Sequence, residues 1–119
     1  LWMYNTSSRI WTLIADYTSV NYGVKGVANI TNSPGARTGA GHWYDPSDHS
    51  LWMFGGYSSN YISDLWKYSI DDGVWTWMSG DNQVEQPTNY PQKGTSSQSF
   101  WPGARWASNI TPDRNGNIW

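Results

Sequence analysis

The sequence predicts an all-β chain, and three observations support that prediction. Short runs of aromatic and β-branched residues alternate with clusters of turn-forming residues. No window keeps apolar residues at helical spacing for three turns. Aromatic residues make up 17% of the chain and charged residues only 13%. The apolar surface available for burial therefore comes mainly from Trp and Tyr, which favour strands.

Short patterns occur twice along the chain. The first four residues, LWMY, match LWKY at 65–68, and the Trp-Thr pair at 11–12 matches the pair at 75–76. The run PGAR occurs at 34–37 and again at 102–105. Repetition at a nearly fixed period indicates repeated structural units. We expect two units, about 1–64 and 65–119.

Each unit is expected to supply four antiparallel strands, because aromatic or branched runs are separated by turn residues. In the first unit the expected strands cover 1–4, 11–14, 37–44 and 51–54, with a turn at 45–48. In the second unit they cover 65–68, 75–78, 105–109 and 117–119, with turns at 71–73 and 112–116.

The order of a few residues resembles the kelch motif. A diglycine ends one strand, an aromatic strand follows, and a tryptophan begins the next. The residues that carry this resemblance, together with their counterparts in the first unit, are Gly55, Gly56, Trp66, Tyr68, Trp75, Tyr4 and Trp11. The chain looks most like the long, Trp-rich kelch repeats of microbial and protist surface proteins and of the attractin type. Its period is longer than the roughly 50 residues usual for kelch repeats.

The resemblance implies a β-propeller of the galactose-oxidase-like central-domain class, in which four-stranded sheets stand around an axis. Two units cannot close a ring that needs about four to eight sheets. We therefore expect residues 1–119 to be a partial propeller with both ends inside strands, completed by further blades of the same chain or by other copies.

Composition excludes several classes of partner. The net charge of −2 provides no basic field for nucleic acid, and no apolar run is long enough for membrane insertion. The absence of cysteine excludes thiol catalysis and thiolate metal sites. Sequons at Asn5 and Asn29 suggest glycosylation, which, with the resemblance, favours an extracellular or cell-surface location.

No metal or cofactor is expected. His42 and His49 flank the turn at 45–48 and could lie close together, but the second unit has no equivalent pair. The run at 113–117 alternates oxygen-bearing residues as calcium loops do, yet its Asn-Gly is sufficient to explain a hairpin turn.

Recognition residues are expected on long polar loops and on one short turn. Tyrosine among small polar residues gives adaptable contacts at low entropic cost. The candidate binding residues are Tyr57, Asn60, Tyr61, Tyr90, Arg37 and Arg105. The two arginines each follow Pro-Gly-Ala, where the resemblance places a charged residue bonded between blades.

The sequence thus predicts a non-catalytic module that recognises protein or glycan. Two alternatives remain open at this point. The chain is a structural segment of an extracellular filament or surface assembly, or it supplies blades to a larger propeller enzyme whose active site lies elsewhere.

Overall fold

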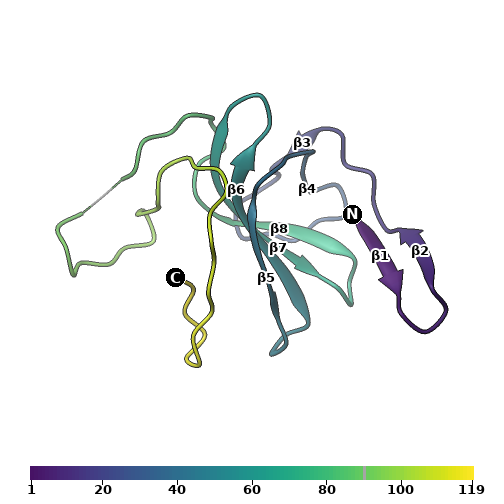
Figure 1. The fold of residues 1–119 in the computed structure, drawn as a ribbon. Coiled ribbons are helices and arrows are strands. Elements are labelled where there is room, and N and C mark those ends of the chain that lie inside the picture. The colour runs from purple at the N-terminus through teal and green to yellow at the C-terminus, as the bar shows by residue number, and fades with distance from the viewer. Residues whose placement is uncertain (90) are drawn as a thin grey trace.

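The structure is a computed structural model that describes residues 1–89 and 91–119. This described part is all-β, with antiparallel strands and no helix (Figure 1). The strands are β1 (Trp2–Asn5), β2 (Ile10–Leu13), β3 (Val20–Asn21), β4 (Ser33–Pro34), β5 (Gly41–Asp45), β6 (Ser50–Tyr57), β7 (Tyr61–Ser69) and β8 (Val74–Ser79). No helix long and apolar enough to cross a membrane occurs in the described residues.

The centre of the molecule is a four-stranded sheet in the order β5-β6-β7-β8. Each strand pairs antiparallel with the next along the chain, as short connections favour. The predicted strands at 51–54, 65–68 and 75–78 all lie within it. The turns expected near 45–48 and 71–73 join its outer strand pairs, so this part of the prediction is confirmed.

The hairpin β1–β2 is a structural copy of β7–β8. Tyr4 pairs with Trp11, and their rings are 4.9 Å apart with planes 43° apart. Tyr68 pairs with Trp75 at 5.0 Å and 48°. The repeated sequence therefore folds into the same cross-strand aromatic pair twice, as expected for residues with the same hairpin register.

The strands group differently from the prediction. The expected first unit does not form one sheet: β1–β2 stands as a separate hairpin, while β5 and β6 join β7 and β8 across the expected boundary at 64/65. The physical reason is chain connectivity. A turn of three residues, 58–60, links β6 to β7, whereas β2 and β5 are separated by the long segment 14–40.

The prediction of strands at 105–109 and 117–119 is also wrong, because neither segment forms a strand in the structure. Residues 105–109 form none, and Ala107 has φ 55, which an extended strand does not allow. Residues 117–119 make only an isolated bridge, Pro112 to Ile118, with reciprocal backbone bonds between Thr111 and Trp119. The turn between these segments is present, since the Asp113 carboxylate accepts from the Asn115 and Asn117 amides.

The two faces of the sheet differ in burial because successive side chains of a strand point to opposite sides. One face, which we call the core face, presents Trp66, Tyr68, Trp75 and Trp77, all buried. Leu1, Tyr17 and Tyr22 from the N-terminal segment pack against it. The opposite face, which we call the pocket face, presents Trp43, Trp52, Phe54 and Leu65 toward residues 100–119.

The segment between β2 and β5 covers the outer edge of β8. The Gly26 and Asn29 amides donate to the carbonyls of Trp77 and Trp75, and the buried Asn32 side chain donates to the Trp75 carbonyl as well. An exposed strand edge is a template for pairing with other chains. This segment therefore closes one edge of the sheet.

Candidate functional site

The turn between β6 and β7 presents two tyrosines to solvent. Tyr57 and Tyr61 are opposite each other in the strand register, with ring centres 5.5 Å apart and planes at 63°. They are 41% and 44% exposed. Asn60 lies between them, and its carbonyl accepts a bond from the Ser58 amide that tightens the turn. Three of the predicted binding residues therefore come together.

Neighbouring segments hold this turn in place. Thr38 exchanges both backbone bonds with Tyr57, at 3.0 and 2.9 Å. The Tyr61 amide donates to the Glu85 carboxylate, and the Glu85 amide donates to the Tyr61 carbonyl. Since both sides of the turn are anchored, the tyrosines stand on a rigid support, which lowers the entropic cost of binding.

Trp106 lies near the same turn. Its indole packs directly over Gly39, where a Cβ would collide with it, and it is 54% exposed. Gly39 follows Thr38, the backbone partner of Tyr57. We call the exposed group formed by Tyr57, Asn60, Tyr61 and Trp106 the aromatic turn surface. Sequence reasoning missed Trp106, although its position directly after the repeated PGAR run was a usable signal.

The diglycine lets a distant segment cross the sheet here. The Gly56 amide donates to the Arg105 carbonyl, and the Arg105 amide donates to the Ile62 carbonyl. Gly55 has φ 64, and a Cβ on it would lie 2.8 Å from the Arg105 carbonyl oxygen. Gly55 therefore combines a positive φ with close backbone approach, two properties that glycine allows and a residue with a Cβ does not.

Arg37 does not belong to an accessible site. Its guanidinium forms a bidentate ion pair with Asp64, at 2.5 and 3.0 Å, and also donates to the carbonyls of Gly55 and Pro34. The two side chains are 4% and 0% exposed. A ligand would have to break this pair to reach Arg37, so its geometry is that of a structural residue.

Asp64 is the centre of a buried polar network. Besides Arg37, it accepts from the Tyr22 hydroxyl at 2.9 Å and from the Trp66 indole N–H at 2.7 Å. Burial, and then the Asp64 carboxylate, raise the pKa of Tyr22 well above its ordinary value. Sequence reasoning missed Asp64. The available signal was a single acidic residue in a strand whose other residues, apart from Lys67, are apolar or carry a hydroxyl group.

The remaining loop tyrosines have different positions. Tyr17 and Tyr22 are partly buried and pack on the core face. Tyr90 lies outside the described residues. Arg105 uses its Nε to donate to the Gly103 carbonyl, and it lines a cavity on the pocket face.

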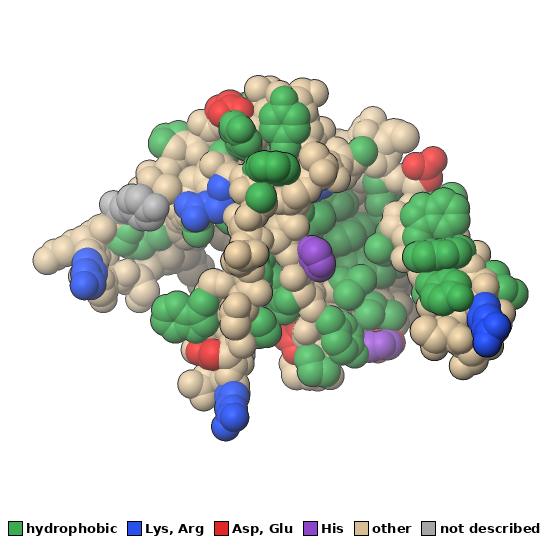
Figure 2. All heavy atoms as spheres, in the orientation of Figure 1, with side chains coloured by type: hydrophobic (Ala, Val, Ile, Leu, Met, Phe, Trp, Pro, Cys, Tyr) green, Lys and Arg blue, Asp and Glu red, His purple; other side chains and the backbone are tan. Residues whose placement is uncertain are grey.

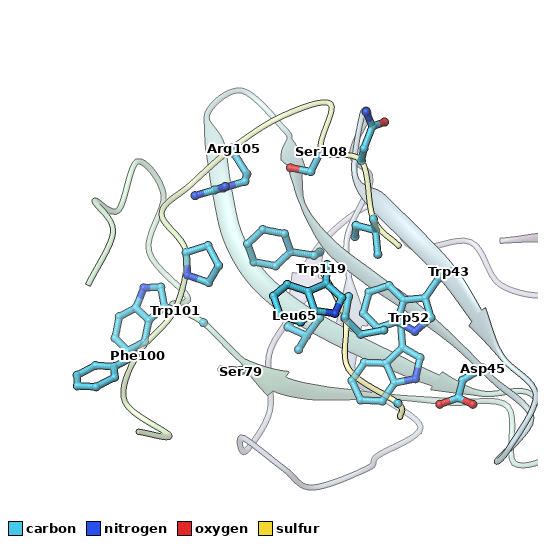
Figure 3. A pocket seen from close by; sticks show the side chains of 17 residues that line it. Trp43, Asp45, Trp52, Leu65, Ser79, Phe100, Trp101, Arg105, Ser108 and Trp119 are labelled. Atoms are coloured by element: carbon cyan, nitrogen blue, oxygen red, sulfur yellow. The ribbon is translucent and has the colours of Figure 1, made fainter. Parts of the chain in front are cut away.

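That cavity, which we call the aromatic pocket, has a volume of about 460 Å³ and lies between the pocket face and residues 100–119. Trp43 and Trp52 stack on one side at 5.3 Å and 9°, while Phe100 and Trp101 lie on the other (Figure 3). The indole N–H groups of Trp52 and Trp101 are buried without a partner among the described residues. Unpaired buried donors are energetically costly. The aromatic pocket therefore contains two hydrogen-bond donors that lack an acceptor.

The histidines do not meet. His49 lies 2.5 Å from the Asp71 carboxylate, across the end of the sheet. His42 is at the start of β5, opposite Met53, with its ring near the Ala40 carbonyl. Among residues 1–89 and 91–119, no three His, Asp or Glu side chains are grouped so that they could hold a metal ion.

The sequon asparagines are exposed and locally bonded. The Asn5 side-chain oxygen accepts from the Ser7 and Ser8 amides in the β1–β2 turn. The Asn29 oxygen accepts from the Thr31 amide and hydroxyl. In both residues these bonds use the side-chain oxygen and not the amide nitrogen, the atom that carries a glycan, and both residues are exposed.

Comparison with family models, with curated proteins and with solved structures finds no match to this chain.

Proposed function

We propose that this chain is a non-catalytic glycan-recognition module of a kelch-type propeller and that sugar rings bind at the aromatic turn surface. One observation carries the proposal. Two exposed tyrosines, Tyr57 and Tyr61, stand edge to face on a turn that is anchored on both sides. Binding residues usually lie on loops and turns that a rigid scaffold positions, and tyrosine offers a large contact area at low entropic cost.

The chemistry of the surface fits a saccharide. The apolar C–H faces of a sugar ring pack on the negative face of an aromatic ring. The Asn60 side chain between the two tyrosines supplies both a donor and an acceptor for hydroxyl groups. Trp106 extends the aromatic area beyond the turn. Glu85, the acidic side chain beside the turn, already accepts a hydrogen bond from the Tyr61 amide and is therefore not free to bind a charged sugar. For this reason we favour neutral sugars.

The propeller part of the proposal is supported by the repeated hairpin and by the diglycine. The hairpins β1–β2 and β7–β8 share one aromatic geometry. The Gly55-Gly56 pair near the end of β6 leaves room for the segment that follows the sheet. Both features agree with sheets that repeat side by side. An extracellular location is part of the proposal, because Asn5 and Asn29 are exposed in sequons.

The test is binding of the chain to an array of immobilised neutral hexose and N-acetylhexosamine oligosaccharides, followed by titration of the best ligand. We expect Tyr57→Ala/Tyr61→Ala to weaken binding by about tenfold or more, as loss of aromatic anchors typically does. Both side chains are exposed, so the thermal unfolding temperature should change little.

Tyr44→Ala is the matched control. Tyr44 is 48% exposed, similar to Tyr57 and Tyr61, but it lies on β5 away from the turn, so this variant should bind normally. Binding to no saccharide, or equal losses in the Tyr44 and turn variants, would contradict the proposal. Retention of a protein partner through the turn tyrosines, without saccharide binding, would indicate protein recognition instead.

A further inference from the structure

The aromatic pocket has side chains of opposite charge at its two ends. Figure 3 shows Arg105 at the end near Trp101. Asp45 lies at the other end, near Trp52. Among the described residues that line the pocket, these are the two charged side chains. The pocket is therefore polarised along its length.

Arg105 presents an accessible guanidinium group. The residue is exposed, and its side-chain hydrogen bond within the described part of the chain runs from Nε to the Gly103 carbonyl. No hydrogen bond or ion pair to another described residue uses its two terminal nitrogens. A guanidinium group is well suited to bind a planar carboxylate. This end of the pocket can therefore hold an anionic group.

A second cation lies at the same end. The Lys25 Nζ donates to the Gly80 carbonyl at 2.8 Å and lies 5.9 Å from the centre of the Trp101 ring. Gly80 and Trp101 both line the pocket. We call the group formed by Lys25, Trp101 and Arg105 the cationic end. Because Lys25 Nζ is already bonded to a carbonyl, Arg105 is the residue that can contact an anion directly.

The basic side chains do not form a broad positive surface. Figure 2 shows the Lys and Arg side chains of the visible face spread apart from one another, and the net charge of the chain is −2. An anion is therefore attracted by the local charges at the cationic end. Asp45 repels an anion from the opposite end of the pocket, so the two ends together determine how an anionic ligand is oriented.

The walls between the two ends are mainly apolar and aromatic. Trp43 and Trp52 stack with planes 9° apart, so they present flat ring surfaces. Phe54 and Leu65 continue this wall along the pocket face, and Trp101 lies across from it. The volume of about 460 Å³ is within the range of small-molecule sites and leaves room for a fused pair of aromatic rings. Planar aromatic rings pack favourably against such walls.

We propose that the aromatic pocket binds a small planar aromatic carboxylate, with its ring between the pocket face and Trp101 and its carboxylate at Arg105. The charges select an anion, and the walls select an aromatic ring. This site is separate from the proposed saccharide site, because none of the residues that line it belongs to the aromatic turn surface.

The test uses three ligands that share one ring system and differ in charge: naphthylacetate, naphthylethanol and naphthylethylamine. At neutral pH the first is an anion, the second is neutral and the third is a cation. Calorimetric titration of the wild-type chain should give affinities that decrease in this order. Naphthylacetate should bind about threefold or more tightly than naphthylethanol, because an exposed ion pair makes a modest contribution. Equal affinities, or no binding of any ligand at millimolar concentration, would overturn the proposal.

Arg105→Gln tests the charge. The residue is exposed, so the variant should fold. It should lower the affinity for naphthylacetate to about that for naphthylethanol and leave naphthylethanol binding unchanged. Arg9→Gln is the matched control, because Arg9 is also exposed but lies in the turn between β1 and β2, outside the pocket. Equal losses in both variants would show an effect of net charge alone and would refute the role of Arg105.

Trp101→Leu tests the position of the ring. It should weaken naphthylacetate and naphthylethanol by the same factor, about tenfold or more, because both lose an aromatic wall. Phe100→Leu, on the same side of the pocket, supplies this test if Trp101→Leu lowers the unfolding temperature. A loss confined to naphthylacetate would contradict the proposed position of the ring. Tyr57→Ala/Tyr61→Ala should bind naphthylacetate as the wild-type chain does, whether or not the chain binds saccharide.

Discussion

The two arginines of the repeated PGAR run differ in whether a carboxylate pairs with their side chain. Arg37 and Arg105 stand in the same PGAR run, yet only Arg37 is paired with an acidic residue in the described part of the chain. Its partner, Asp64, accepts four bonds from three side chains and is fully buried. A buried charge is tolerated only when it is paired and hydrogen-bonded. The Asp64 carboxylate meets both conditions, whereas Arg37 keeps one buried donor, Nε, without a partner among the described residues.

Asp64→Asn should therefore destabilise the fold strongly. The variant leaves the buried Arg37 guanidinium without a countercharge, at a cost of about 3–5 kcal/mol. Asp48→Asn is the control. It removes the carboxylate that pairs with Lys67 near the surface and should cost less than about 1 kcal/mol. Urea unfolding measures both. Similar midpoints for the two variants would refute the central role of Asp64.

At the scale of elements, close backbone approach joins the sheet to the segment that follows it. Residues 105–107 cross the β6–β7 turn by donating to Ile62 and Gly39 and accepting from Gly56. Only glycine leaves room for this crossing at position 55. The segment 21–33 closes the β8 edge in a similar way, with Asn32 buried against the strand.

Gly55→Ala should reveal the steric part of this crossing. Gly55 and Gly116 both have positive φ, so alanine is strained at either position. Only at Gly55 would the added Cβ meet a backbone oxygen, whereas Gly116 has open space around it. We expect Gly55→Ala to lose at least about 1 kcal/mol more than Gly116→Ala in chemical unfolding. Equal losses would show that the close approach contributes nothing.

At the scale of the whole molecule, the packing is uneven. The radius of gyration is 14.8 Å, whereas a compact domain of this length has about 13.5 Å. The core face is well covered, but the pocket face and the hairpin β1–β2 still present Trp side chains. The N-terminal segment is tied to the sheet by Tyr22, which stacks on Trp66 at 5.3 Å and donates to Asp64.

The hydrogen bond from the Tyr22 hydroxyl to Asp64 should weaken at alkaline pH. The pKa of Tyr22 is raised above its ordinary value of 10.0, first by burial and then by Asp64. When a folded-state pKa is raised, its stabilisation is complete below the unfolded pKa and is lost as pH increases toward the folded pKa. Above pH 10, the wild-type chain should therefore lose stability that Tyr22→Phe does not lose. The difference in unfolding free energy between the wild-type chain and Tyr22→Phe should become smaller as pH increases above 10. A difference that stays constant would contradict the raised pKa of Tyr22.

The sequence by itself determined the local structure. The all-β class, the turns at 45–48 and 71–73, and the repeated Tyr-Trp hairpins follow from short-range patterns, because hairpin register and turn type depend on neighbouring residues. The sequence also located the Tyr57–Tyr61 turn among the candidate binding residues. The diglycine at 55–56 is visible in the sequence as part of the kelch resemblance, but the close contact that it admits, with the Arg105 backbone, appears only in the structure.

Tertiary structure decided everything that depends on contacts between distant segments. It placed β5 and β6 with β7 and β8, removed Arg37 from the accessible surface by pairing it with Asp64, and assigned Tyr17 and Tyr22 to the core. It also left Tyr4 exposed while burying its repeat, Tyr68. The two hairpins share the same Tyr-Trp pair and register, so their local sequence does not account for the difference in burial. The difference arises because burial depends on which distant segment of the folded chain packs against each hairpin.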